Sequence, residues 1–200
     1  MLFISNSKYK GLPLAIFGGF LLVGGFFVLN SYIYNGKHVD TAASYENAEY
    51  VIDGRRVKLN NGISETEVAP GSASKIITRH FGNELTSALD GDGDEDVAFV
   101  LTQTTGGSGT FYYAVAALKT PNGYIGSDGY LLGDRIAPQT TELSPNLKHV
   151  GVVVFNYADR APGEPMTIRP AIAKSVYLKI VPETVQWVIV EPDFEGESAL

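Results

Sequence analysis

Five acidic residues within seven positions form the part of the sequence with the most specific chemistry. Residues 90–96 read D-G-D-G-D-E-D. Calcium is a hard cation that takes roughly six to eight oxygen ligands from a flexible loop. Carboxylates at alternate positions can converge on one point where glycines let the chain coil tightly. The sequence therefore predicts a structural calcium site formed by four aspartates: Asp90, Asp92, Asp94 and Asp96.

A second interpretation of this segment needs no metal. A solvated acidic turn between two strands would carry the same run of charges, and short motif matches of this kind often mislead. Without a cation, however, the clustered carboxylates repel one another. If an ion binds, a structural role that staples the domain is favoured over catalysis.

The three histidines do not form a recognisable metal site. His38, His80 and His149 lie far apart in the sequence, and none has a partner at a zinc-ligand spacing such as H-x3-H. Ser108 and His80 can be written into a Ser-His-Asp set, but no G-x-S-x-G elbow is present. The sequence thus favours a non-catalytic protein over an enzyme.

Two Asp-Arg pairs, Asp134-Arg135 and Asp159-Arg160, each follow an expected strand and precede a loop that contains proline. One interpretation is a polar binding patch at one end of the sheet. The favoured interpretation is structural, because charged pairs at strand ends usually fix the loop. The enzymatic alternative is an envelope hydrolase that uses carboxylates such as Asp134, Asp159 or Glu164, two of which would face one cleft about 5–10 Å apart.

Residues 12–34 form an uncharged apolar segment that predicts one transmembrane helix. Such a helix would be roughly 34 Å long, enough to cross the hydrocarbon layer. Lys8 and Lys10 favour a cytoplasmic location for residues 1–11, so the rest of the chain would be periplasmic or extracellular. A cleaved signal peptide is the alternative, but the segment exceeds the usual apolar length of about 7–15 residues, which favours an uncleaved signal anchor.

The remainder of the chain is strongly acidic. From residue 36 onward there are 22 acidic residues against 13 lysines and arginines, a formal charge of −9. This charge argues against a nucleic-acid partner, which requires a basic face, and against docking on anionic lipid. The sequence contains no cysteine, so no disulfide can stabilise the fold.

Turn signals at short intervals predict an all-β domain over residues 48–192. No long amphipathic helix appears after residue 36, and Asp-Gly and Asn-Gly dipeptides favour tight hairpins. The expected strands are 48–52, 57–59, 75–81, 97–102, 111–118, 124–132, 150–157, 176–181 and 185–190. They indicate a mostly antiparallel sandwich or partly closed barrel. Residues 35–47 are expected to be a polar linker and residues 193–200 a flexible acidic tail.

The aspartate segment resembles the calcium loop of FG-GAP repeats and of dockerin-like modules, with the pattern D-x-D-G-D-x-x-D before an apolar strand. By this resemblance, the third, fifth and ninth loop positions fall on Asp90, Asp92 and Asp96. The seventh position, which gives a backbone carbonyl, falls on Asp94. The first position, normally an acid that binds the ion directly, is Ala88.

A larger part of the chain, residues 48–180, resembles a group of uncharacterised bacterial membrane-anchored envelope proteins. Besides the aspartate segment, the resemblance is carried by A-P-G-S-A-S-K (69–75), F-G-N-E (81–84), Q-T-T-G-G-S-G-T-F-Y-Y (103–113), L-G-D-R-I-A-P-Q-T-T-E (132–142) and N-Y-A-D-R-A-P-G-E-P-M (156–166). It implies an anchored β domain on the secreted side of the membrane with a calcium-type loop, and it implies no activity.

Taken together, these features predict a non-catalytic, membrane-anchored extracytoplasmic domain that serves binding or envelope assembly. Its partners would be the membrane, through the N-terminal helix, and a protein or glycan. Two alternatives remain open. One is the envelope hydrolase described above, and the other is a small accessory subunit of a membrane complex that works through its glycine-bearing helix.

Overall fold

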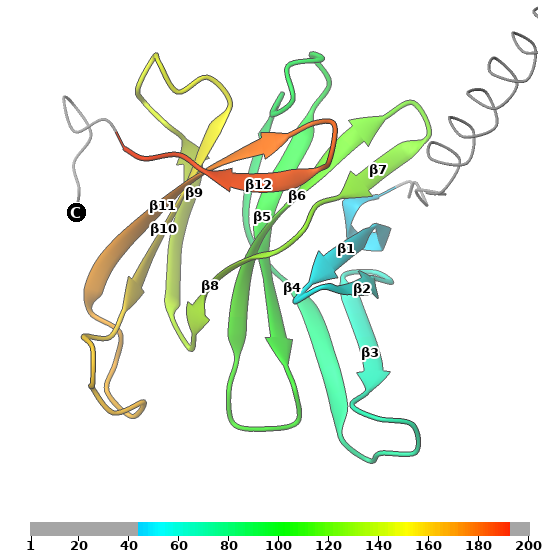
Figure 1. Cartoon of the computed structure of the whole chain (residues 1–200), viewed down its shortest axis with the longest axis vertical. Coiled ribbons are helices and arrows are strands. Elements are labelled where there is room, and N and C mark those ends of the chain that lie inside the picture. Colours follow the sequence, from blue (N-terminus) through cyan, green and yellow to red (C-terminus); the bar gives the residue numbers. More distant parts are fainter. Residues whose placement is uncertain (1–43, 193–200) are drawn as a thin grey trace, which may run out of the picture. The chain divides into compact units, whose positions relative to one another are not determined.

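A computed structural model describes residues 44–192, which fall in one compact unit of the chain (Figure 1). The described residues form β-strands and one short 3-10 helix, η1 (Tyr45–Asn47). This confirms the expected all-β fold. The expected transmembrane helix over residues 12–34 and the acidic tail over residues 193–200 lie outside the described residues. Within the described part of the chain, no helix has the length and apolar character needed to cross a membrane.

The strands form three antiparallel sheets. Their bounds are β1 (Glu49–Ile52), β2 (Arg55–Lys58), β3 (Ile63–Glu67), β4 (Lys75–Ser87), β5 (Asp96–Thr104), β6 (Phe111–Thr120), β7 (Gly123–Gly126), β8 (Tyr130–Asp134), β9 (Ala137–Leu143), β10 (Val152–Asp159), β11 (Ile172–Val181) and β12 (Gln186–Ile189). The first sheet has six strands in the order β3-β4-β5-β6-β7, with β8 also paired to β6. The second has the order β12-β11-β10-β9, and β1 and β2 form a separate hairpin. Both large sheets keep free edges, so the fold is not a closed barrel.

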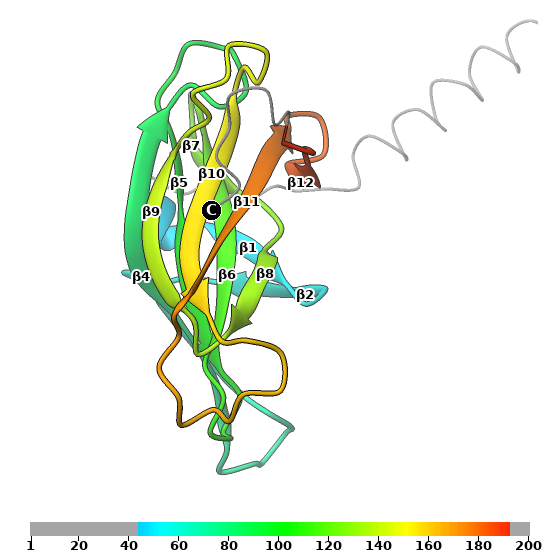
Figure 2. The ribbon, with the colours of Figure 1, turned by 90° about the vertical axis from the view of Figure 1, so that its left-hand side faces the viewer.

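The first core lies between the two large sheets. Alternate residues of β5 and β6, such as Val100 and Ala116, meet Phe155 on β10, Leu178 on β11 and Trp187 on β12. Figure 2 shows strands β9 to β11 as a layer in front of β5 and β6. The Trp187 indole also donates a hydrogen bond of 3.1 Å to the carbonyl of Ala114 on β6. These contacts fix the second sheet against one face of the first.

The second core lies on the opposite face of the six-stranded sheet. There the β1–β2 hairpin places Tyr50, Ile52 and Val57 against Phe99 and Leu101 of β5. Consecutive residues of a strand point to opposite faces, so β5 supplies side chains to both cores in alternation. This explains why β5 is a continuous apolar run, as expected for a strand buried on two faces.

The β1–β2 hairpin closes through a two-residue turn that the sequence predicted. Asp53 and Gly54 both have positive φ values, 49° and 73°. An Asp-Gly pair favours this turn because glycine adopts positive φ without steric cost and aspartate tolerates it. The four residue pairs from Glu49↔Lys58 to Ile52↔Arg55 then follow in register.

Two strands that the sequence analysis missed are β3 and β9. Both lie at sheet edges, and both are rich in polar and exposed residues. Pro138 in β9 also argues against a strand by composition, although proline is tolerated at an edge. Edge strands need no apolar run, so the pattern used to find central strands does not detect them.

Other boundaries also differ from the expectation. The strand expected over residues 124–132 is two strands, because the buried Ser127 interrupts the pairing with β6: its hydroxyl accepts from the Ala116 N–H at 2.8 Å. Residues 45–47, expected in the linker, form η1, and Tyr45 packs against Phe99 with ring centroids 5.4 Å apart. The folded domain therefore begins earlier than residue 48.

Candidate functional site

The aspartate segment connects β4 to β5, and its carboxylates differ in the hydrogen bonds that they accept. Asp96 is completely buried, and its carboxylate accepts backbone hydrogen bonds from Leu89 (2.7 Å), Asp90 (3.3 Å) and Lys119 (2.8 Å). Burial raises the Asp96 pKa above its ordinary value, while these backbone donors oppose the rise. Asp96 therefore organises the loop as an acceptor of peptide N–H groups.

The other three aspartates keep carboxylate oxygens that the loop does not use. Asp90 and Asp92 each accept one backbone hydrogen bond through Oδ1, from Asp92 and Asp94 respectively. Asp92 and Asp94 are exposed. These are suitable oxygen types for calcium, but no group of three or more acidic or histidine side chains within residues 44–192 is arranged to hold a metal ion. The observed loop is not a preformed cage, so calcium binding here stays a prediction from the sequence.

The two Asp-Arg pairs do meet. The Arg160 guanidinium donates to the carbonyl of Arg135 at 2.9 Å and to that of Ile168, and the Asp159 carboxylate accepts from the Arg160 backbone N–H at 2.7 Å. The Arg135 guanidinium bonds the Asp134 carboxylate. Arg160 therefore fixes loop carbonyls, which agrees with the favoured interpretation of the sequence, whereas Arg135 bonds only the neighbouring carboxylate.

The carboxylates suggested for a hydrolase are engaged in the same loops. Arg135 and the Thr110 N–H, outweighing the effect of burial, lower the Asp134 pKa. The hydrogen bond from Lys174 lowers the Asp159 pKa. Glu164 accepts from the backbone of Ala161 at 2.8 Å. A general acid needs a raised pKa, so the electrostatics of Asp134 and Asp159 support loop stabilisation over proton donation.

His80 contributes to the attachment of η1. Its Nε2 lies 2.9 Å from Glu84 Oε1, although the ring N–H is not aligned for a hydrogen bond, and its Nδ1 lies 3.7 Å from Glu46 Oε1. The Tyr45 hydroxyl donates to the same Glu84 oxygen at 3.0 Å. Burial, and to a smaller extent the hydrogen bond to the Glu84 carboxylate, raise the pKa of Tyr45 to about 12. The cluster joins η1 to β4.

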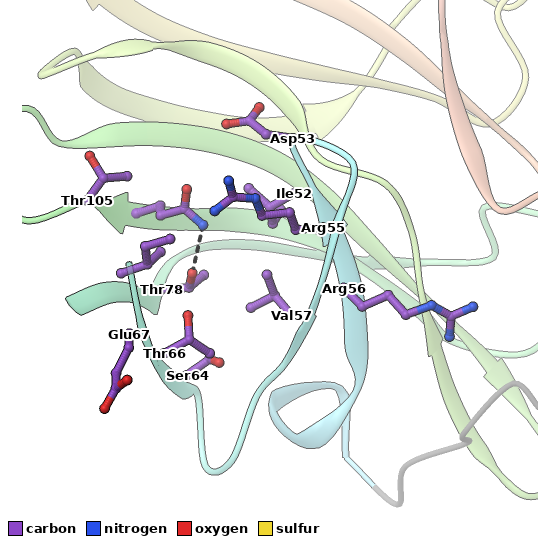
Figure 3. Close-up of a pocket in the computed structure, with 12 residues that line it drawn as sticks. Ile52, Asp53, Arg55, Arg56, Val57, Ser64, Thr66, Glu67, Thr78 and Thr105 are labelled. Carbon is purple, nitrogen blue, oxygen red and sulfur yellow. Dashed lines mark hydrogen bonds between the residues drawn. The ribbon is translucent and has the colours of Figure 1, made fainter. Parts of the chain in front are cut away.

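A cavity of about 420 Å³ lies where the β1–β2 hairpin overhangs the first sheet, and we call it the hairpin pocket (Figure 3). Its lining residues are Ile52, Asp53, Arg55, Arg56, Val57, Ser64, Thr66, Glu67, Ile76, Thr78, Gln103 and Thr105. The hairpin is shorter than the sheet strands beneath it, so it covers the apolar part of this face and leaves the polar end open.

The strand register places the polar groups of the hairpin pocket in a row. Ser64 on β3 is opposite Thr78 on β4, and Thr78 is opposite Gln103 on β5. Gln103 and Thr78 are buried, and the Gln103 amide donates to the Thr78 hydroxyl at 3.0 Å, the dashed line in Figure 3. This pair forms a polar floor inside a face that is otherwise apolar at β5.

The four charged residues of the hairpin pocket differ in their partners. Arg56 pairs with Glu49 at 2.8 Å, Asp53 accepts from Tyr113 at 2.7 Å, and Glu67 accepts from the Gly71 N–H at 2.8 Å. The Arg55 side chain forms no hydrogen bond or ion pair within the described part of the chain. It is therefore the one charged group of the pocket lining with its full bonding capacity unused.

Sequence reasoning did not find this pocket. Its residues come from β1, β2, β3, β4 and β5, and β3 was not expected as a strand. The signal in the sequence was polar residues at alternate positions, Ser64 and Thr66. Only the strand register shows that they lie beside Thr78 and Gln103.

Comparison of the chain with known protein families, with curated proteins and with solved structures finds no match.

Proposed function

We propose that this chain is a non-catalytic binding protein whose β domain holds a small polar ligand in the hairpin pocket. The observation that carries the proposal is the Arg55 guanidinium, which has no partner among residues 44–192 and lies above a buried polar floor. Small-molecule sites combine apolar walls with a few convergent polar groups. Ile52, Val57 and Ile76 supply such walls here.

The unused hydrogen-bonding capacity supports binding over a purely structural role. Side chains that serve a loop are satisfied within the protein, as the Arg135 and Arg160 guanidinium groups are. The hydroxyls of Ser64, Thr66 and Thr105 form no side-chain hydrogen bond within residues 44–192. A ligand would supply the partners that these groups take from water in its absence.

We further propose that the domain works on the outer side of a membrane. The uncharged segment over residues 12–34, with Lys8 and Lys10 before it, supports an anchor and this orientation. A binding domain tethered there would meet envelope glycans and peptides, which agrees with a role in binding or envelope assembly.

The experiment is ligand-observed NMR on the full-length chain in a mild detergent, with glucose, glucuronate and a glycyl-glutamate dipeptide as separate probes. Thr66→Trp, on the exposed edge strand β3, would fill the hairpin pocket. Glu65→Trp places the same side chain one residue earlier, on the opposite face of β3, and is the matched control. We expect at least one probe to bind the wild type and Glu65→Trp, and to lose its signal with Thr66→Trp. Absence of binding by all three probes, or equal binding to both variants, would refute the proposal.

A further inference from the structure

We infer that the ligand of the hairpin pocket is a polyhydroxylated monocarboxylate, a sugar acid of the uronic acid type. The inference rests on the proposed binding function and specifies the ligand that Arg55, the hydroxyl row and the Gln103 amide would recognise together.

The charge of the ligand follows from Arg55. Its guanidinium is unpaired within the described residues and lies over the pocket in Figure 3. A planar guanidinium binds a carboxylate through two parallel hydrogen bonds. The domain around it is acidic, so a lone unpaired arginine in a cavity is the feature that would draw an anion there.

The same lining limits the ligand to one negative charge. Arg56 is held by Glu49, and in Figure 3 its side chain extends away from the other lining residues. Glu67 and Asp53 add negative charge to the lining of the pocket. A phosphate dianion normally requires several cationic or peptide N–H donors. The pocket offers one free cation beside two carboxylates, which suits a carboxylate better.

The neutral groups indicate ligand hydroxyls. Ser64, Thr66 and Thr105 carry hydroxyls that both donate and accept hydrogen bonds. The Gln103 side-chain NH₂ donates to the Thr78 hydroxyl, and the Gln103 side-chain carbonyl oxygen forms no hydrogen bond within the described residues. Sugar hydroxyls also both donate and accept, so they match this set better than an aliphatic or amine ligand does.

The lining and the volume of the hairpin pocket argue against aromatic ligands and against full burial of a long polymer. No aromatic ring is among the lining residues, so neither a nucleobase nor the apolar face of a neutral sugar would find a stacking partner. The volume of about 420 Å³ is in the lower part of the range for small-molecule sites. A ligand of roughly one or two sugar rings fits this size.

The test uses two adjacent arginines that the structure gives different roles. Binding of sodium glucuronate to the full-length chain would be measured by titration calorimetry, with glucose and glucose 6-phosphate as the neutral and dianionic comparisons. Arg55→Gln removes the unpaired charge, and Arg56→Gln is the same change at a paired neighbour. Thermal unfolding of both variants checks that they remain folded.

We expect glucuronate to bind more tightly than glucose or glucose 6-phosphate. Arg55→Gln should weaken glucuronate binding by about tenfold or more, while Arg56→Gln should change it less than about twofold. Equal effects of the two variants, or tighter binding of glucose or the phosphate, would overturn the inference but leave a pocket that binds small polar ligands. Failure of all probes, including the dipeptide, would remove the proposed function as well.

Discussion

The Tyr113 hydroxyl on β6 donates a hydrogen bond of 2.7 Å to Asp53 Oδ2 in the turn of the β1–β2 hairpin. Tyr113 is buried in the second core, and burial together with this carboxylate raises its pKa. The bond joins residues 60 positions apart in the chain. It therefore holds the hairpin turn, one wall of the hairpin pocket, against the sheet.

Replacing Tyr113 with phenylalanine should release this turn. We expect Tyr113→Phe to lower the free energy of unfolding by about 1 kcal/mol and to weaken glucuronate binding about threefold or more, because the pocket wall is no longer preorganised. The control is Tyr50→Phe, the same change in the same core, whose hydroxyl donates instead to the Tyr45 carbonyl at 2.7 Å. Calorimetry and thermal unfolding would compare the two. An equal loss of affinity in both variants would contradict the role given to Tyr113.

Asp96 should matter for stability whether or not a metal binds. In Asp96→Asn an amide NH₂ replaces one acceptor oxygen, so at least one of the backbone N–H groups of Leu89, Asp90 or Lys119 loses its partner. We expect the free energy of unfolding to fall by about 1–3 kcal/mol, measured by urea unfolding with EDTA present. The exposed Asp92→Asn should stay within about 0.5 kcal/mol of the wild type. A harmless Asp96→Asn would show that the loop does not depend on this carboxylate.

Calcium binding by the aspartate loop is the prediction that comes from the sequence alone. Calorimetric titration of the full-length chain should give a dissociation constant in the sensor range, roughly 10⁻⁷–10⁻⁵ M, and calcium should raise the melting temperature by mass action. Asp92→Ala should abolish the heat. Because Asp92 is exposed, the metal-free protein should lose only the stability of the exposed hydrogen bond that Asp92 Oδ1 accepts from the Asp94 N–H. No heat in the wild type would leave a solvated acidic turn as the correct interpretation.

Acid should weaken the loop that Asp159 supports. The hydrogen bond from Lys174 holds the Asp159 pKa below its ordinary value of 3.8. A depressed folded-state pKa contributes stability that is fully present above 3.8 and is lost as the pH falls below it. Thermal unfolding across this range should therefore show a smaller acid-dependent loss in Asp159→Asn than in the wild type.

Asp128 gives the opposite sign and serves as the control for this measurement. Burial raises its pKa above 3.8, despite the hydrogen bond that it accepts from the Trp187 N–H at 2.8 Å. Protonation as the pH falls toward 3.8 then favours the folded state. Asp128→Asn should remove this gain. The same change of slope in both variants would contradict the assignment of the two carboxylates.

The sequence predicted the central strands well because strands that are buried on both faces consist mostly of apolar residues. Phe111 to Leu118 and Val152 to Tyr157 are apolar runs between turn signals, and both lie in central strands. The final hairpin, β11 and β12, was also expected. The edge strands β3 and β9 were missed because they are largely exposed to solvent, so they contain many polar residues and no apolar run.

Of the two candidate sites, the sequence showed the one built from consecutive residues and not the one built from distant strands. The aspartate loop was found because its residues are consecutive. The sequence did not show that Asp96 is buried, or that one of its three peptide donors is Lys119, 23 positions away. The hairpin pocket was not found because Arg55, Ser64 and Gln103 become neighbours only when β1–β2 folds over β3, β4 and β5. No local pattern encodes that arrangement.

Alternate side chains of β5 point into two different cores, and this limits insertions and deletions within the strand. Ala98 and Val100 face one core, while Phe99 and Leu101 face the other. Inserting or deleting a single residue within β5 would exchange the two sets, sending the small side chain of Ala98 into the space of Phe99 and the reverse. Lineages of this protein should therefore vary in length at the exposed residues 106–108 and keep β5 free of insertions and deletions.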